Sequence, residues 1–400
     1  MAKFPLPAST FPRLEFPQKD VGELEALSNL LVERTLVQYH EHEVVRRGVI
    51  DKARWKTVRQ VQGIKAFRER TTTTKRAADT ATNRNGSVIP MLMVAGTIPG
   101  DLFDVMYGVL NPTTEAMRIK SSYDDDGLVD GCVLATLIKP SAEDPLRSLT
   151  LRWAVKRNPL FMAPMIRNRD AVYIESTGIA YTKSGERIGY QLVHSVELPG
   201  VHELVEHQII RADFSLCYIY RQKTTETVDV FMHGIQNPRG VMPPSVGVIT
   251  IAEALVSVST YVHCAEMKKL TWLLRTAKTI LKADPPSDTS QCAVCSQSIR
   301  TSCPLQKYVC AVCSSQICSK CCATRKISSI SPLKYNEVIQ TKVSFCVRCV
   351  ERALAKSSVE IAAEEANDPN SLFEFRTMAD STSGSTNSSS SSRTIPRTAL

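Results

Sequence analysis

The sequence lacks the motifs that mark the commonest enzyme classes. It contains no phosphate-binding loop, no GxSxG nucleophile turn and no glycine set of the dinucleotide-binding type placed after a strand. Because no nucleophile can be paired with a base, we expect a protein that is not an enzyme. Aromatic residues are scarce at 6%, whereas 43% apolar and 22% charged residues exclude a wholly disordered chain.

A secretory signal is missing as well. The start of the chain, MAKFPLPASTFPRLEF, holds no apolar stretch as long as a signal-peptide core behind its basic residue. The apolar stretch 245–265 is nearly long enough to cross a bilayer, but Glu253 near its middle would cost about 2.5–3.5 kcal/mol there. A buried helix is therefore favoured over a membrane span. We expect a cytoplasmic protein with no transmembrane span.

Cysteine is the residue whose distribution is most uneven. Ten of the thirteen cysteines fall between Cys292 and Cys349, and Cys132, Cys217 and Cys264 are scattered over the rest. Without export, clustered cysteines favour metal ligands, although a disulfide-bonded domain stays open as an alternative.

Hydrophobic periodicity divides the first 280 residues into helices and strands. The expected elements are an irregular leader over 1–20, an amphipathic helix over 21–47, strands over 55–68 broken at Gln62-Gly63, a loop over 71–87, a strand over 88–98 and a helix over 101–110. Alternating strands follow over 132–138, 149–155, 172–175, 214–221 and 228–232, and then one long apolar helix over 244–281.

This order predicts an α+β fold with a curved antiparallel sheet around a long C-terminal helix. The space between sheet and helix is a natural cavity for a hydrophobic ligand, and a fully packed core is the alternative.

Residues 55 to about 274 resemble a START lipid-binding domain, whose helix-grip fold encloses one lipid. The matching stretches are WKTVRQVQGIKAF, RNRDAVYIES and VDVFMHGIQNPRGVMPP, followed by the last helix. Arg169-Asp170 correspond to the arginine–aspartate pair that opens a central strand in the family. The resemblance implies a lipid in a START-like cavity; it does not identify which lipid, because ligand-contacting residues differ among members.

One segment imitates a zinc-protease motif. In His202-Glu203-Leu204-Val205-Glu206-His207 the two histidines are five residues apart, about 140° around a helix, so they do not share a face. We expect a solvated loop or short helix here.

Four CxxC pairs carry the strongest signal of the chain. A CxxC knuckle presents two thiolates to one metal, so eight cysteines predict two structural Zn²⁺ ions with no open coordination position. Only four residues separate the second pair from the third, too few for those two to share a metal comfortably, which favours interleaving of first with third and second with fourth. The predicted ligands are Cys292, Cys295, Cys310, Cys313, Cys318, Cys321, Cys346 and Cys349. Cys303 and Cys322 fall outside the pairs and are expected to be ordinary thiols or substitute ligands.

The spacing of these pairs over 291–352 resembles a FYVE zinc finger. The resemblance implies an interleaved two-zinc fold and a surface that reads phosphatidylinositol 3-phosphate on endosomal membranes. Three of the family's lipid-reading motifs are altered, however. The basic RRHHCRxCG stretch is LQKYVCAVCS here, with Lys307 as the one charge before the cysteine, the WxxD motif is absent, and SFC replaces RVC. The resemblance therefore implies the FYVE fold for this segment but not the family's headgroup specificity.

Charge within this segment supports weak contact with an anionic membrane. Residues 292–355 hold nine basic and two acidic side chains, a net charge of +7 that two zinc ions on eight thiolates reduce to +3. The whole chain falls likewise from +9 to +5. The weakly basic face that remains is either solvated or in contact with lipid. Its positive charge is too small to indicate a nucleic-acid partner.

Composition then completes the division into domains. We expect a leader (1–20), a START-like domain with an N-terminal helix (21–282), a linker (283–291), a FYVE-like zinc finger (292–355), and a helical extension with a disordered Ser-rich tail (356–400). The leading hypothesis is a lipid-binding protein of membrane trafficking whose zinc finger contacts a phosphoinositide membrane or a protein. The alternative is a protein-interaction scaffold without a lipid. A ubiquitin-ligase RING is disfavoured because no histidine lies beyond His263.

Overall fold

The computed structural model describes residues 4–367 except 8–9, 13, 71–88, 125, 157–165, 241, 243, 281–290, 300–307, 332 and 335–336. The loop predicted at 71–87, nearly all of the linker predicted at 283–291, Cys303, Lys307 and the tail predicted beyond residue 381 lie outside these described residues.

One large antiparallel sheet forms the body of the chain up to residue 280, called the sheet part below. Its strands are β1 (Trp55–Val61), β2 (Ile64–Glu69), β3 (Met91–Pro99), β4 (Leu128–Ile138), β5 (Ser148–Lys156), β6 (Arg169–Tyr181), β7 (Arg187–Ser195), β8 (Ile210–Arg211), β9 (Asp213–Thr224) and β10 (Thr227–Asn237). The strand order is β1-β2-β3-β10-β9-β7-β6-β5-β4, and short β8 pairs in parallel with the start of β6.

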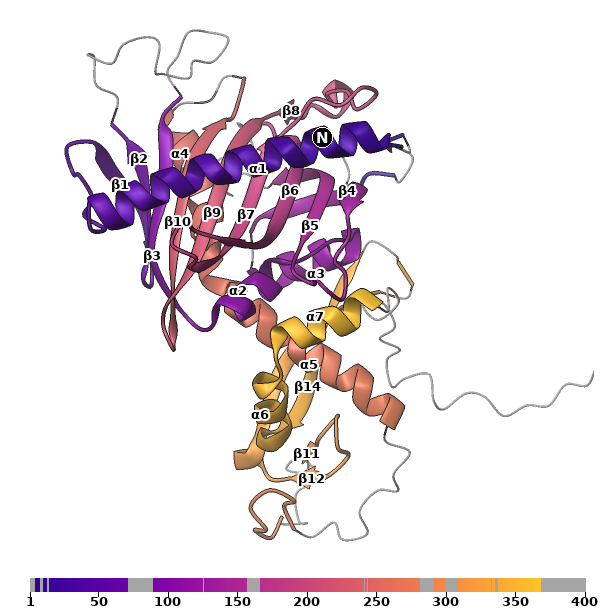
Figure 1. Ribbon diagram of the computed structural model, residues 1–400. Coiled ribbons are helices and arrows are strands. Elements are labelled where there is room, and N and C mark those ends of the chain that lie inside the picture. Colours follow the sequence, from indigo (N-terminus) through magenta and orange to yellow (C-terminus); the bar gives the residue numbers. More distant parts are fainter. Residues whose placement is uncertain are drawn as a thin grey trace, which may run out of the picture.

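Helices cover both faces of this sheet (Figure 1). Helix α1 (Gln18–His40), extended by a π-helical turn (Glu41–Val45), lies across the outer face and buries Val32 and Tyr39 there. The inner face is covered by α2 (Leu102–Val109), α3 (Thr114–Asp124), α4 (Pro244–Val256) and α5 (Tyr261–Ile280).

The predicted α+β class, with a long antiparallel sheet and a long C-terminal helical segment, is confirmed. The single helix predicted over 244–281 is broken, however, since a 3₁₀ turn (Ser257–Thr260) separates α4 from α5. Sequence reasoning also missed β7 and α3. The alternation of Ile188, Tyr190 and Leu192 could have revealed β7, whereas α3 is too polar to show a clear apolar face.

A strand such as β5 has no solvent-facing side, although its alternation predicts one. Leu151 contacts the cluster under α1, and Trp153 packs against Phe11 of the N-terminal leader with ring centroids 4.8 Å apart. Arg152, on the opposite side of the strand, is only 2% exposed. Alternation therefore located two distinct faces correctly, but the polar one points into the molecule.

The remaining elements form a small cysteine-rich unit, called the cysteine module below (residues 291–355). It comprises β11 (Tyr308–Val309), β12 (Gln316–Ile317), β13 (Cys322–Ile330), β14 (Val338–Cys346) and α6 (Val347–Ala355). Helix α7 (Ser358–Asn367), in the region where a helical extension was predicted (356–400), follows a break after α6 and returns to the sheet part. Within the described residues, the structure contains no helix with the length and apolarity needed to cross a bilayer.

Candidate metal centre and ligand interior

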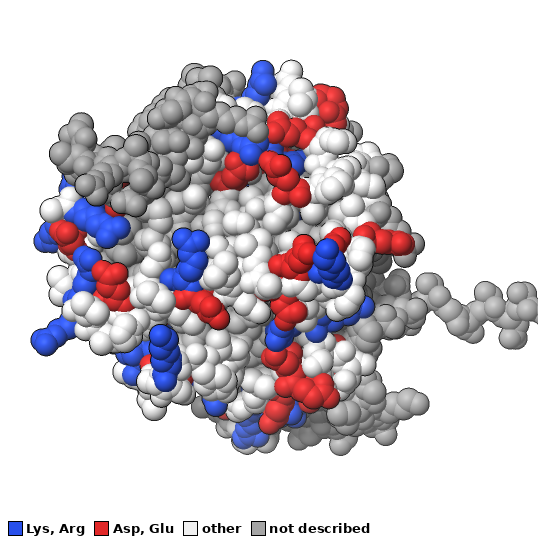
Figure 2. Space-filling model, turned by 45° about the horizontal axis from the view of Figure 1, so that its top comes forward, with Lys and Arg blue, Asp and Glu red and all other residues white. Residues whose placement is uncertain are grey.

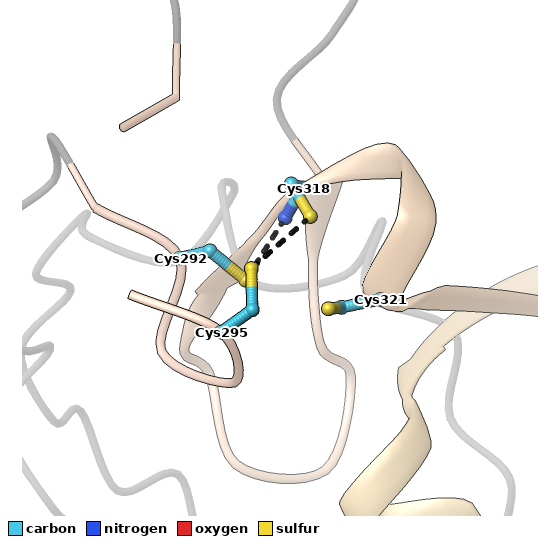
Figure 3. Close-up of side chains that lie close together, drawn as sticks. All are labelled: Cys292, Cys295, Cys318 and Cys321. Carbon is cyan, nitrogen blue, oxygen red and sulfur yellow. Dashed lines mark hydrogen bonds between the residues drawn. The ribbon is translucent and has the colours of Figure 1, made fainter. Parts of the chain in front are cut away.

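The eight predicted ligands gather into two groups of four, paired in the interleaved order. Cys292, Cys295, Cys318 and Cys321 form the first group, shown converging in Figure 3. The second group is Cys310, Cys313, Cys346 and Cys349. Within each group all sulfur atoms lie within 4.8 Å of one another.

The sulfur spacing suits a tetrahedral metal rather than disulfides. Cys295 Sγ lies 3.8 Å from Cys318 Sγ, and Cys313 Sγ lies 3.9 Å from Cys346 Sγ. A tetrahedron with Zn–S bonds of about 2.3 Å has S–S edges of about 3.8 Å, whereas a disulfide measures about 2.05 Å. All cysteines of the described part are free thiols. Each group therefore has the donor set and spacing to hold one metal ion.

The first two CxxC knuckles share one backbone geometry. Ser296 N–H donates to Cys292 O and Ser314 N–H to Cys310 O, at 2.8 and 2.9 Å. Both serines have left-handed φ angles, 57° and 56°, which a non-glycine residue adopts at a cost of about 1–2 kcal/mol. The turn that presents two sulfurs on one side therefore forms although it requires an unfavourable backbone conformation at each serine.

Backbone N–H groups also stabilise the thiolates from the partner knuckle. Cys318 N donates to Cys292 Sγ at 3.4 Å, and Cys346 N donates to Cys310 Sγ at 3.2 Å. A hydrogen bond from the Cys349 thiol, together with the backbone N–H groups of Cys313, Cys346 and Val312, lowers the pKa of Cys310 to about 4, and the same hydrogen bond raises the pKa of Cys349. Metal binding requires the thiolate form, which this environment favours at Cys310.

Cys322 stands outside both groups. Its sulfur lies 3.8 Å from Thr324 Oγ1, and the residue begins β13 directly after the ligand Cys321. Its place outside both groups favours the ordinary thiol of the two expectations for this residue.

The His202–His207 segment forms no metal site in the described structure. It is loop with a 3₁₀ turn (Val205–His207), as expected from its histidine spacing. Asp170 of the predicted arginine–aspartate pair accepts two hydrogen bonds from Arg211 and one from Trp153 Nε1, all 2.8–2.9 Å long. Its role is to join β6 to β5 and β8.

The inner face of the sheet is apolar at one end. Around β2, β3, β9 and β10 it presents Ala66, Leu92, Val94, Tyr218 and Val230, which pack against α2, α4 and α5. Gly108 of α2 allows the close approach of α5, because a Cβ there would lie 2.0 Å from Tyr261 O.

At β5, β6 and β7 the inner face carries a buried ion pair instead. Arg152 pairs with Glu175, and it also donates to Thr150 Oγ1 and to the side chain and carbonyl of Asn111. Gln191 Nε2 donates to Glu175 Oε1 at 2.8 Å, and Gln191 Oε1 accepts from Tyr220 OH at 3.1 Å. This network, which we call the polar end of the interior, was not predicted from the sequence.

Comparisons with known proteins reveal similarity in fold alone. No protein-family model and no curated protein matches the sequence. The solved structures that it is similar to include human StAR-related lipid transfer protein 5, with a TM-score of 0.40 and 13% identity over 62% of this chain and 98% of that chain. Human STARD10 gives a TM-score of 0.36 and 11% identity over 56% of this chain and 79% of that chain. The STAR-related lipid transfer protein from Xanthomonas axonopodis gives a TM-score of 0.36 and 16% identity over 52% of this chain and 99% of that chain.

Proposed function

We propose that this chain is a non-enzymatic, lipid-binding protein that holds an amphiphilic lipid between its sheet and the helices α2, α4 and α5. The observation that carries the proposal is the graded inner face. One end is apolar, and the other buries Arg152 and Glu175, at 2% and 4% exposure. An apolar enclosure with a few converging polar groups is the usual composition of a ligand site. The lipid's chain would occupy the apolar end and its polar group would reach the polar end.

The cysteine module is proposed to bind two structural Zn²⁺ ions through the eight paired cysteines. Zinc would supply no chemistry here, because four thiolates leave no open coordination position. It would instead stabilise a unit whose own apolar core is small.

This module is also proposed to contact anionic membrane surfaces, with a cytoplasmic and peripheral endosomal location. Lys326 and Lys342 lie directly opposite each other in the β13–β14 hairpin, an arrangement of like charges that is unfavourable without an anionic partner. Both are exposed, and neither forms a salt bridge with a described residue. On the face shown in Figure 2, basic and acidic side chains are interspersed. The altered lipid-reading motifs leave headgroup choice open to experiment.

The scaffold alternative has one observation in its favour. The inner-face side chains pack against Leu255, Val258 and Tyr261 of the helical segment, and all three are at least 94% buried. A lipid would have to displace part of this packing. Without lipid, the chain would be a protein-interaction scaffold with a structural zinc module.

Native mass spectrometry of the purified full chain separates the two functions. Two zinc ions plus an added mass of lipid size support lipid binding, and extraction of lipid from vesicles should give the same adduct. Two zinc ions with no lipid, before or after incubation with vesicles, favour the scaffold. A metal-free protein with paired cysteines would overturn the zinc assignment.

Flotation with vesicles tests the membrane surface. Wild type is compared with Lys326→Glu/Lys342→Glu on phosphatidylcholine vesicles that contain phosphatidylserine or phosphatidylinositol 3-phosphate. The matched control is Lys19→Glu/Lys52→Glu, which changes the net charge by the same amount at two exposed lysines far from the hairpin in the chain. Selective loss in the hairpin variant supports the surface, and equal flotation of all three proteins counts against it.

A further inference from the structure

A single helix belongs to the apolar cores of both parts of the molecule. The first turns of α5 pack inside the sheet part through Tyr261 and Ala265. Its later turns pack with the cysteine module, where Leu270 and Leu274 lie in one cluster with the ligand cysteines and Phe345. The helix that covers the interior is therefore in direct apolar contact with the cysteine module.

The segment after the second cysteine group starts on its ligands. Cys346 is the N-cap of α6, and its sulfur accepts a hydrogen bond from Cys349 N at 3.4 Å within the first turn. Cys349 is itself part of α6. The position of α6 is thus fixed by the second group, and α7 follows α6 after a two-residue break. We call α6 and α7 together the clasp (347–367).

The clasp reaches α2 through a buried lysine of α5. Lys269 is 3% exposed, and its Nζ lies 2.7 Å from Asp104 of α2 and donates to Leu354 O of α6 at 3.2 Å. Ser358, at the start of α7, donates to the same Asp104 carboxylate at 2.6 Å. The Asp104 carboxylate of α2 therefore connects α5 with α7, and the Lys269 ammonium of α5 connects α2 with α6.

Helix α7 also covers α2 directly. Ile361 and Ala362 are buried in the same apolar cluster as the residues of α2. Glu365 accepts a hydrogen bond from Tyr107 OH at 3.0 Å and pairs with Arg275 of α5 at 2.6 Å. Because Tyr107 is fully buried, breaking these contacts leaves its hydroxyl without this acceptor.

We infer that the clasp is a metal-anchored lock on α2, so that zinc at the second cysteine group keeps the interior closed. Without the metal, α6 loses its fixed origin and the polar contacts to Asp104 and Tyr107 release together. Helix α2 covers the inner face with Leu102 and Met106, so its departure opens a route to the interior. That such an opening would admit a lipid rests on the proposed function. The lock itself requires no lipid.

Hydrogen exchange of the full chain tests the lock without lipid. Removing zinc with a chelator should raise exchange of the α2 amides at least about tenfold, the change expected for loss of one charge-assisted hydrogen bond. Amides of β9, in the sheet, should keep their protection. Unchanged α2 protection in metal-free protein would overturn the lock, and so would an equal loss in α2 and β9, which indicates general unfolding.

Two variants separate the lock from loss of the module's fold. Glu365→Gln should raise α2 exchange while both zinc ions remain by native mass spectrometry. Glu360→Gln is the matched control, because Glu360 lies on α7 and pairs with Lys356 of the break between α6 and α7. It should leave α2 unchanged. Equal exchange of the α2 amides in the two variants would refute the lock. Absence of lipid binding in either variant would count against the proposed function alone.

Discussion

The buried pair of Arg152 and Glu175 gives a prediction that the structure makes quantitative. Both side chains are almost inaccessible, at 2% and 4%, and each is bonded to further polar groups. Arg152→Met would leave the carboxylate buried without its cation, which costs about 3–5 kcal/mol of unfolding free energy. For a unit of this size that loss corresponds to a melting temperature lower by roughly 10 °C. Glu175→Leu should lower the melting temperature by a similar amount, because it leaves the Arg152 guanidinium buried without its carboxylate.

The double variant Arg152→Met/Glu175→Leu should be much milder than the two single variants added together. Replacing a buried pair by apolar side chains of similar volume is often neutral, so the remaining loss is that of the hydrogen bonds that Asn111 and Gln191 made to the pair, about 1–3 kcal/mol. The measurement is thermal and urea unfolding of the zinc-loaded chain by circular dichroism. A double variant that loses as much as both single variants combined would refute the reasoning, since the charges would then not be coupled.

Three further predictions follow from other sites. Gly108→Ala should lower the free energy of unfolding by about 3 kcal/mol, because its new Cβ would meet Tyr261 O. Gly22→Ala in α1, where a new Cβ has nothing within 4 Å, should raise the free energy of unfolding slightly. The urea midpoints of the two variants check both expectations. Burial, with a smaller contribution from a neighbouring arginine, lowers the pKa of His233 to about 4, so the unfolded chain takes up its proton first as pH falls. Stability should therefore drop by roughly 3 kcal/mol between pH 6.5 and 4, and a pH series of melting curves should be flatter for His233→Phe. Cys313→Ser should lower the zinc content from two ions to one by native mass spectrometry, and retention of two ions would contradict the assigned group.

The sequence predicted the elements whose residues carry a period of their own. Alternation located β9 and β10, and the turn at Gln62-Gly63 separated β1 from β2. It could not tell which side of β5 faces the interior, because α1 and the leader cover the outer side and make both faces buried. The polar end went unnoticed for this reason, since Arg152 in an alternating strand has the pattern of a solvent-exposed residue.

The cysteine groups were predictable because knuckle spacing is local geometry, and the four-residue gap between the second and third pairs disfavours a metal shared by those two. The position of α7 has no such signature. Its polar residues Glu360, Glu364 and Glu365 are typical of any solvated helix, and only the fold shows that Glu365 meets Tyr107 and Arg275 while Glu360 pairs with Lys356 at the break before its own helix. Glu360 and Glu365 thus lie on one helix but have entirely different partners. That difference is a property of tertiary contact, which makes the comparison of Glu365→Gln with Glu360→Gln a test of the structure itself.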